Sequence, residues 1–276
     1  MDGQKNFALV TGASSGIGLA LSTELARHGY PLLLVSNEEA RLVETALELE
    51  AKYRVRAIAL YMDLAQSDSA QRVFDYCEAN ALRIEILVNN AGIFFFKYVT
   101  ETPCELAQTI INLHVLTPTI LSKLIAQQMI RENRKGHILN IASISSRMMM
   151  PGIALYSSTK SYLRCFSRAM RNEVFDKGIG ITTVCPGAVA TGLYTFPSRY
   201  MRLGIRLGVV LSAERFARLA LKKMFQGKAE YIPSGFLNRL FIFVVATMPE
   251  GLIRWLKRKI DLVKATPGTI KTTRAR

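Results

Sequence analysis

The stretch NFALVTGASSGIG at residues 6–18 decides how the chain is expected to fold. An apolar run leads into three glycines, Gly12, Gly16 and Gly18, and then into a segment of helical period that ends near His28. Gly12 permits a tight turn, Gly16 lets the backbone approach a pyrophosphate at a helix N-terminus, and Gly18 allows the helix to pack closely on the strand. The stretch therefore predicts a strand, a phosphate-binding turn and a helix.

Five further apolar runs follow, separated by amphipathic segments: PLLLV, VRAIALY, IEILV, HILNIA and IGITTV. This alternation predicts a parallel sheet, and runs that are apolar throughout suit strands covered by helices on both faces. We expect an α/β fold, a doubly wound Rossmann-like parallel sheet, forming a single domain over residues 1–235 with a C-terminal helical extension over 236–276. Ligands of such sheets bind beyond the carboxyl ends of the strands, so chemistry is expected just after each run.

Cysteine and histidine usage excludes several classes of site. The four cysteines are widely spaced without a CxxC pair, and the three histidines are not clustered with carboxylates or cysteines. Neither a disulfide framework nor a metal site is therefore expected. The N-terminal sequence does not have the pattern of a signal peptide, and a reducing cytoplasm is the expected location.

The positive charge of the chain is concentrated in its last third. The net charge is +15, but residues 1–195 carry 19 Lys and Arg against 17 Asp and Glu, whereas residues 196–276 carry 17 against 4. This asymmetry favours an anionic partner for the last third, such as lipid head groups or nucleic acid. A solvated basic face that aids solubility is the alternative.

Four motifs carry a resemblance to a known family. TGxxxGxG at 11–18, NNAG at 89–92, YSSTK at 156–160 and PGAVAT at 186–191 follow one another at the spacing of the short-chain dehydrogenase/reductase family. The chain resembles that family over about residues 7–195. The resemblance implies an NAD(P)(H)-dependent oxidoreductase that interconverts a ketone and an alcohol by hydride transfer.

The resemblance also implies where the cofactor lies. Asp63 would contact the adenine, Pro186, Gly187 and Thr191 would flank the nicotinamide, and for Asn89 a structural role is at least as plausible as binding. The full set of implied cofactor contacts comprises Gly12, Ser14, Ser15, Gly16, Ile17, Gly18, Ser36, Asn37, Asp63, Leu64, Asn90, Ala91, Gly92, Tyr156, Lys160, Pro186, Gly187, Val189 and Thr191.

The residues after the second strand bear on the choice between NAD and NADP. An acidic residue there would bind the ribose 2′-hydroxyl of NAD, whereas an arginine would favour NADP. Ser36 stands where NAD-preferring relatives carry Asp, and Asn37 where many NADP-preferring relatives carry Arg. Both can donate hydrogen bonds to a phosphate, while Glu38 and Glu39 are expected to begin the next helix. We expect NADP(H) to be favoured over NAD(H).

Tyr156 and Lys160 are the first two candidate catalytic residues. They lie four apart in a segment of helical period, so their side chains project from one face. An ammonium near a phenol favours the phenolate and lowers the tyrosine pKa, so Tyr156 can exchange a proton with a substrate oxygen while hydride is transferred. The resemblance implies that Lys160 also holds the nicotinamide ribose.

Ser143 and Asn112 complete the expected catalytic group. Ser143 lies thirteen residues before Tyr156, the family spacing for the serine that polarises the carbonyl, and Ser145 and Ser146 are competitors. The resemblance makes Asn112 one link of a water-mediated proton relay that ends at the lysine. The alternative for Asn112 is a helix-bending residue bonded to backbone. His114, two residues further on, is expected to be structural.

Two apolar clusters indicate a bulky hydrophobic substrate. They are Phe94–Phe96 and Met148–Met150, although both suit core or lid packing equally well. The resemblance implies a mobile substrate lid at about 190–211, where three arginines alternate with large apolar residues.

The C-terminal extension mixes apolar and basic residues. Its apolar run Leu240–Met248 is far shorter than the ~20 residues that span a bilayer. Pro249 and Gly251 separate this run from a second helix in which Trp255 lies among lysines and arginines, a composition suited to an anionic membrane interface. The alternative is packing on the lid or on a second subunit of a homodimer or homotetramer; nucleic acid is a weaker candidate, because no recognised binding module accompanies the charge. Shallow membrane burial would involve Phe236, Leu240, Phe241, Phe243 and Trp255.

The sequence therefore predicts an NADP(H)-preferring ketoreductase for a hydrophobic or lipid-like ketone, such as a 3-oxo-acyl, 3-ketosphinganine-like or steroid compound. It is expected in the cytoplasm, peripheral at the inner membrane face. The rival hypothesis is a non-catalytic NAD(P)-binding sensor or scaffold, since one fold hosts many functions.

Overall fold

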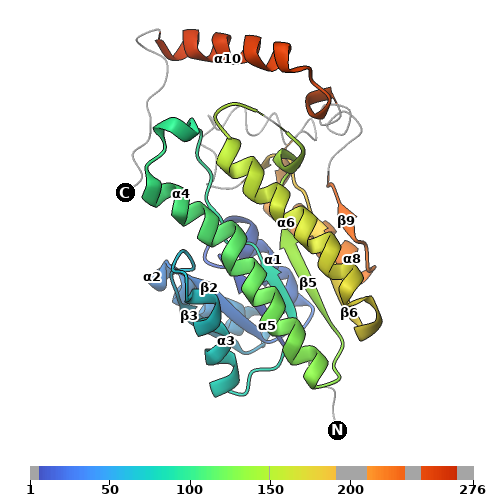
Figure 1. The fold of residues 1–276 in the computed structure, drawn as a ribbon. Helices are drawn as coiled ribbons and strands as arrows, with labels where there is room; N and C mark the ends of the chain where they lie inside the picture. The colour runs from blue at the N-terminus through green and yellow to red at the C-terminus, as the bar shows by residue number, and fades with distance from the viewer. Residues whose placement is uncertain (1–5, 149, 191–209, 234–243, 266–276) are drawn as a thin grey trace.

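The structure is a computed structural model that describes residues 6–148, 150–190, 210–233 and 244–265 (Figure 1). Its centre is a seven-stranded sheet in the order β3-β2-β1-β4-β5-β6-β9, in which every neighbouring pair is parallel. The doubly wound α/β prediction and all six predicted apolar strands are confirmed. The strands are β1 (Phe7–Thr11), β2 (Leu32–Ser36), β3 (Ala57–Tyr61), β4 (Ile84–Asn89), β5 (Gly136–Ile141), β6 (Ile179–Val184) and β9 (Glu230–Tyr231).

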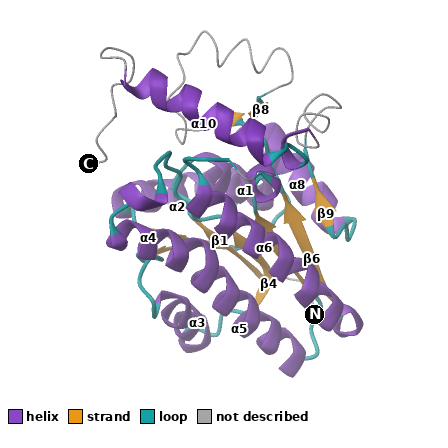
Figure 2. Ribbon diagram, turned by 45° about the horizontal axis from the view of Figure 1, so that its top comes forward, coloured by secondary structure: helices purple, strands orange, loops and turns teal. Residues whose placement is uncertain are grey.

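Helices cover both faces of the sheet (Figure 2). The α-helices are α1 (Gly16–Arg27), α2 (Glu39–Tyr53), α3 (Ser69–Ala79), α4 (Cys104–Ile111), α5 (Thr117–Arg131), α6 (Ala154–Glu173), α8 (Ala213–Phe225) and α10 (Glu250–Ala265). The shorter helical turns are η1 (Val99–Glu101), the π-helix η2 (Asn112–Leu116), η3 (Ile144–Arg147) and η4 (Phe175–Lys177).

Alternate residues of each strand enter two separate cores. In β1, Ala8 and Val10 pack with α1, α2 and α8, whereas Leu9 packs on the opposite face with α3, α5 and α6. All three side chains are completely buried. A strand buried on both faces needs apolar residues at every position, which explains the uninterrupted apolar runs of the sequence.

The strand order reverses direction at β1, because β2 lies on one side of it and β4 on the other. The register pairs Val10 with Val88, so the residues after Thr11 and after Asn89 emerge next to each other. Such a switch point opens a crevice beyond the carboxyl ends of the strands, where ligands of this architecture bind. The fold therefore places the glycine turn beside the NNAG segment.

One helical stretch among the described residues, Cys104–Arg131, is long and apolar enough to cross a membrane. It comprises α4, η2 and α5 and packs along the sheet (Figure 1). Leu121, Ile125 and Met129 of this stretch are buried in the same core as Leu9. Its apolar composition is explained by this packing.

A second, two-stranded parallel sheet joins β7 (Val189–Ala190) to β8 (Leu211–Ser212). It brings together the two ends of the segment expected to form the lid. Several predictions fall on residues outside the described part: Thr191 and most of the lid, Met149, Phe236, Leu240, Phe241 and Phe243.

Helix α10 crosses the end of the molecule at which α6 begins (Figures 1 and 2). It starts at Glu250, directly after Pro249, so Gly251, which was expected to separate the two helices together with Pro249, lies inside α10. Lys257 of α10 lies over the ring of Tyr98, with 5.1 Å from its Nζ to the ring centroid. Helix α10 of the extension thus lies at the end of the sheet where the glycine turn and the start of α6 are found (Figures 1 and 2).

Candidate active site

The glycine turn has the geometry that a dinucleotide needs. Gly12 and Gly16 have φ angles of +66° and +56°, a region that residues with a Cβ rarely occupy. A Cβ on Gly18 would overlap the carbonyl oxygen of Gly12, so α1 can approach the turn only because residue 18 is glycine. Ser15 precedes α1 without a side-chain cap hydrogen bond. The first turn of α1 can therefore offer backbone N–H groups to a pyrophosphate, and the residues present fit a nicotinamide dinucleotide.

Thr11 and Asn90 fix this turn against the end of β4. The Thr11 hydroxyl donates to the Val88 carbonyl at 3.2 Å and accepts from the backbone N–H groups of Asn90 and Ala91 at 2.9 and 3.0 Å. The Asn90 amide donates to the Thr11 carbonyl at 2.9 Å. Thr11 was not among the predicted site residues, although its position at the carboxyl end of β1 was the available signal.

Asn89 faces away from this turn. Its amide donates to the Ser122 hydroxyl at 3.0 Å and to the Asn140 side-chain oxygen at 2.7 Å, and only 5% of the residue is exposed. These partners lie on α5 and β5. They give Asn89 the structural role that the sequence left open.

Ser14, Ser36 and Glu38 form a hydrogen-bonded cluster where the adenosine ribose is expected. The Ser14 hydroxyl donates to the Glu38 carboxylate at 2.9 Å and lies 2.9 Å from the Ser36 hydroxyl. Helix α2 begins at Glu39, so Glu38 precedes it and turns its side chain back toward the glycine turn. The sequence did not predict a carboxylate here. It is an acceptor for a ribose hydroxyl and would repel a phosphate.

Asp63 shapes the turn after β3. Its carboxylate accepts hydrogen bonds from the Ala65 backbone N–H at 3.0 Å and from the Gln66 amide at 3.1 Å. Leu64 is 3% exposed and packs in the core with Leu9. A contact of Leu64 with an adenine would therefore have to use its backbone.

Tyr156 and Lys160 project from one face of α6, as predicted. The Lys160 Nζ lies 5.9 Å from the centroid of the Tyr156 ring and donates to the Ile141 carbonyl at 3.0 Å. Tyr156 is 7% and Lys160 5% exposed. Burial lowers the pKa of Lys160 to about 8, against an opposing effect of Cys185. The Lys160 ammonium is thus a buried cation. Its hydrogen bond to Ile141 holds it at the end of β5, and Ile141 lies two residues before Ser143.

His114 braces the turn of α6 that carries Tyr156. Its Nε2 accepts from the Ile93 backbone N–H at 3.0 Å, which places the ring proton on Nδ1, 3.0 Å from the Thr159 hydroxyl. Thr159 in turn donates to the Tyr156 carbonyl at 2.9 Å. Burial, with the nearby charge of Lys160, lowers the pKa of His114 well below its usual value. A neutral imidazole with a hydrogen bond at each ring nitrogen agrees with the structural role expected for His114.

Ser143 follows β5 and begins η3. Its Oγ accepts from the Ser145 backbone N–H at 3.1 Å, so its own proton is available to another acceptor. The Ser145 Oγ is buried without a hydrogen-bond partner in the described part of the chain, whereas the Ser146 Oγ lies 4.0 Å from the Cys185 sulfur. Ser145 therefore stays a competitor for the role of carbonyl donor.

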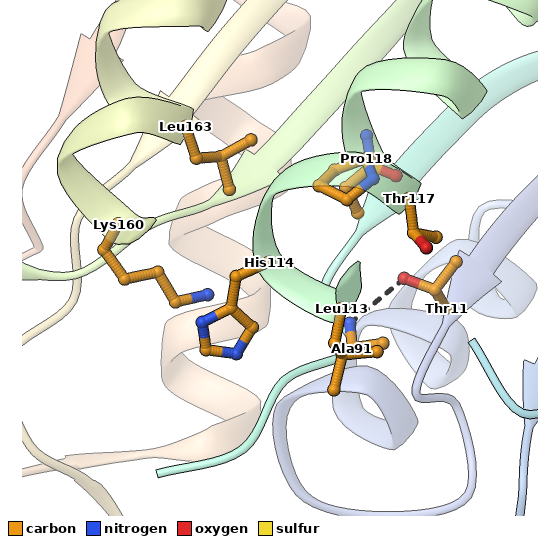
Figure 3. A pocket seen from close by; sticks show the side chains of 9 residues that line it. Thr11, Ala91, Leu113, His114, Thr117, Pro118, Lys160 and Leu163 are labelled. Carbon is orange, nitrogen blue, oxygen red and sulfur yellow. Dashed lines mark hydrogen bonds between the residues drawn. The ribbon is translucent and has the colours of Figure 1, made fainter. Parts of the chain in front are cut away.

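Asn112 lies at the point where α4 becomes the π-helix η2. Its amide donates to the Ala65 carbonyl at 2.8 Å, so the side chain ties this helix to the turn after β3. Next to η2 is a small enclosed cavity of about 10 Å³ whose lining includes His114, Thr117 and Lys160 (Figure 3). A space of this size is at the lower limit for one water, and a relay from η2 to Lys160 would require one.

Three charged residues that the sequence analysis did not single out join the last strand to this site. Glu230 of β9 accepts from Arg164 of α6 at 3.1 Å and also pairs with Arg147 of η3. Burial would raise the pKa of Glu230, but the two arginines hold it below its usual value. No local sequence motif predicts this group of three charged residues, because only the pairing of β9 with β6 brings Glu230 to the two arginines.

Aromatic residues line the side of Tyr156 on which a substrate is expected. The Phe94 ring meets the Tyr156 ring edge-on at 5.0 Å. Phe96 lies against Gly152, whose φ of +85° and lack of a Cβ make room for the ring. Pro186, Gly187 and Val189 are predicted to lie near the nicotinamide. The Pro186 carbonyl accepts a hydrogen bond from the Ile144 backbone N–H at 2.9 Å. A Cβ on Gly187 would have room, and Val189 is buried in β7.

Comparisons with known proteins agree with this geometry. The profile described as short chain dehydrogenase matches residues 6–198. The very-long-chain 3-oxoacyl-CoA reductase-B of Danio rerio is 34% identical over 270 residues, which cover 92% of this chain and 83% of that protein. The inactive hydroxysteroid dehydrogenase-like protein 1 of Rattus norvegicus is 31% identical, over 71% of this chain. The chain spans 59% of that rat protein and 58% of the Danio rerio reductase-A, less than two thirds of their lengths.

A solved structure has the same fold. The alcohol dehydrogenase of the archaeon Thermococcus sibiricus, complexed with 5-hydroxy-NADP, superposes with a TM-score of 0.70 at 25% identity. The superposition covers 82% of this chain and 95% of that one.

Proposed function

Because the chain belongs to the short-chain dehydrogenase family, we propose that it reduces the ketone of a long-chain 3-oxoacyl thioester with NADPH. One observation carries the proposal: a buried ammonium, Lys160, lies over the ring of Tyr156, and an aromatic wall adjoins that ring. The names of the 3-oxoacyl-CoA reductases that are similar to this chain support the substrate class. Steroid and 3-ketosphinganine-like ketones are the alternatives within the same chemistry.

The proposed roles follow from the geometry. A bound nicotinamide supplies the hydride. Tyr156 donates its phenolic proton to the carbonyl oxygen, and Ser143 donates a hydrogen bond to the same oxygen as negative charge develops. Lys160 keeps a positive charge beside the phenol and holds the cofactor ribose, and Asn112 positions η2 for a water next to Lys160. His114 and Thr159 position the turn without exchanging protons.

A panel of ketones tests this proposal. We expect oxidation of NADPH with 3-oxoacyl thioesters and slower oxidation with small ketones such as acetoin. The rival function is a non-catalytic sensor, which the rat relative named as inactive keeps open. Cofactor binding without turnover of any lipid-like ketone would favour the sensor and overturn the reductase.

We propose NADP(H) as the preferred cofactor because Ser36 and Asn37 offer neutral hydrogen-bond donors and the Thermococcus enzyme binds an NADP analogue. Glu38 opposes this preference from its place beside Ser14. Binding of a 2′-phosphate requires its carboxylate to turn away, and Arg41, 3.9 Å from that carboxylate, offers a partner outside the cluster.

Titration of both dinucleotides tests the preference. We expect Glu38→Gln to tighten NADPH binding several-fold and to leave NADH binding almost unchanged. A wild-type preference for NADH that Glu38→Gln reverses would show that the carboxylate, rather than Ser36 and Asn37, sets the choice.

We further propose that the face of α10 turned away from the enzyme attaches it to anionic membrane. Leu252 and Trp255 are 45% and 53% exposed, and Arg258 and Lys259 lie on the same side of the helix at i+3 and i+4 from Trp255. Exposed apolar side chains with basic neighbours suit the interface of an anionic bilayer. The enzyme would then be cytoplasmic and peripheral at the inner membrane face.

Co-sedimentation with phosphatidylserine vesicles tests this attachment. Trp255→Ser should reduce the bound fraction at low salt, and high salt should release the wild type. Wild-type protein that stays in the supernatant at low salt would overturn the proposal and favour an intramolecular role for the extension.

Self-association as a homodimer or homotetramer is proposed on exposed apolar side chains of the α4–α6 side. Ile111 and Tyr162 are 43% and 40% exposed, and Tyr162 stacks on Phe166 at 5.9 Å. Light scattering after size-exclusion chromatography would measure the mass, and a monomer at micromolar concentration would contradict the proposal.

A further inference from the structure

A second cavity in the described part of the chain lies against α10. Its volume is about 610 Å³, within the range of pockets that hold cofactor-sized or drug-sized ligands. The walls come from three places: η1 with Tyr98, the loop at Pro151–Gly152 with Ala154, and Lys257 of α10. Ala154 is the first residue of α6, two residues before Tyr156. The cavity therefore lies at the N-terminal end of the helix that carries Tyr156.

A strip of aromatic rings connects this cavity with Tyr156. Phe94 meets Tyr156, Phe96 lies against Gly152, and Tyr98 lies under Lys257. The backbone of the strip is tied to the loop before α6, because the Lys97 N–H donates to the Gly152 carbonyl at 2.8 Å. Phe94, Phe96 and Tyr98 thus contact Tyr156, Gly152 and Lys257 in turn.

We propose that this cavity binds the phosphorylated end of the coenzyme A carrier of the substrate, with Lys257 as the cation that contacts its phosphates. The inference rests on the proposed 3-oxoacyl thioester reduction. With the ketone at Tyr156, the pantetheine arm runs along Phe96 and Tyr98, and the charged end reaches α10. An ammonium is a recognised partner of phosphate, and an exposed one contributes to affinity rather than to chemistry.

The cavity lining contains one positively and one negatively charged side chain, so two substitutions can test the proposal in opposite directions. Lys257 is the basic residue of the lining and Glu101 is its acidic residue, and both are exposed. A polyanion is attracted by the first and repelled by the second, so the two substitutions should act in opposite directions. Arg258 and Lys259 lie on the same helix and add positive charge near Lys257, whereas Arg254 is paired with Glu250 at 2.8 Å.

The test compares two substrates that differ only in the phosphorylated nucleotide: a medium-chain 3-oxoacyl-CoA and the 3-oxoacyl thioester of pantetheine. Lys257→Ala should raise KM for the CoA thioester about two- to fivefold, the range of a solvent-exposed charge contact, and leave kcat and the KM for the pantetheine thioester unchanged. Glu101→Gln should lower KM for the CoA thioester alone. The control is Lys52→Ala, since Lys52 also lies over a tyrosine ring, at 5.5 Å from Tyr53, but on α2.

The outcomes separate this inference from the proposed function. Absence of turnover with both thioesters contradicts the reductase itself. Turnover of both with unchanged KM values in Lys257→Ala overturns the carrier site while leaving the reductase intact. Equal rises in KM for both thioesters show that the cavity holds the acyl chain or the arm, which also overturns the assignment of the phosphates to Lys257.

Discussion

Lys160 and Lys257 both lie over tyrosine rings, yet their surroundings differ. Lys160 is 5% exposed and its Nζ lies 5.9 Å from the Tyr156 ring, whereas Lys257 is exposed and lies 5.1 Å from the Tyr98 ring. The first is enclosed by β5, η2 and α6, and the second is on the surface of α10. A buried charge acts strongly on its neighbours because little water screens it, while an exposed charge acts weakly because water and salt screen it. The comparison assigns chemistry to the buried region and substrate affinity to the surface region.

The largest effect is expected from removing the hydroxyl of Tyr156, the ring over which the buried Lys160 lies. Tyr156→Phe keeps the ring against Phe94 but has no proton to donate, so kcat should fall at least about a hundredfold. Cofactor binding, measured by fluorescence, should survive, because the variant loses only the hydroxyl and keeps the ring. Near-normal turnover would show that the buried region around Lys160 does not carry the chemistry.

The next effect concerns the glycine turn. In Gly18→Ala the new Cβ would overlap the Gly12 carbonyl oxygen, so α1 must move away from the turn. We expect cofactor affinity to fall at least about tenfold and the free energy of unfolding to fall by about 1–3 kcal/mol, as for other overpacked sites. Gly251→Ala is the control, since a Cβ there meets nothing within 4 Å. Unchanged affinity in Gly18→Ala would show that the turn does not hold the cofactor.

A third prediction concerns alkaline pH. The pKa of Lys160 is lowered to about 8 by burial, so the ammonium is present below that pH and is lost above it. The value of kcat/KM, which reports the free enzyme, should therefore fall as the pH rises through about 8. Lys160→Arg, which keeps its charge, should remove this fall even if its overall activity is low. A wild-type profile that stays flat to pH 9.5 would contradict the assigned role.

The smallest effect is on stability at acidic pH. Burial keeps the pKa of His114 well below 6.5, so the unfolded chain binds a proton that the folded chain does not bind. Stability is then complete above the unfolded pKa and is lost as the pH falls below about 6.5, with a slope of at most about 1.4 kcal/mol per pH unit for one histidine. His137, whose pKa is also lowered, adds to the same loss.

Urea titrations between pH 7 and pH 5 would measure this dependence. His114→Gln retains an acceptor for the Ile93 N–H but cannot be protonated in this range, so its stability should depend less steeply on pH. An identical slope in the variant would assign the acid sensitivity to His137 or to other groups.

The parts of the molecule that sequence patterns predicted are those set by local rules. Apolar runs predicted β1 to β6, and the YSSTK spacing placed Tyr156 and Lys160 on one face of α6. Gly12, Gly16 and Gly18 lie where the tasks assigned to them require. These features depend on residues close in sequence, where the period of a helix or a strand is sufficient.

The features that were not predicted depend on contacts between distant segments. Glu38 bends back to Ser14 across the glycine turn, and Glu230 meets Arg147 and Arg164 only because β9 pairs with β6. The cavity under Lys257 likewise needs the path of the whole extension. Side-chain direction and long-range strand pairing are not encoded in any short window of sequence.

The β7–β8 pair has a consequence for how this protein can be re-engineered. Because Val189 pairs with Leu211 and Ala190 with Ser212, the residues that flank segment 191–209 are held next to each other. The entropy of closing a loop grows slowly with length, by roughly 0.6 kcal/mol for each doubling. Insertions and replacements between the two strands should therefore behave as an exchangeable cassette, with the sheet and the catalytic helix left as they are.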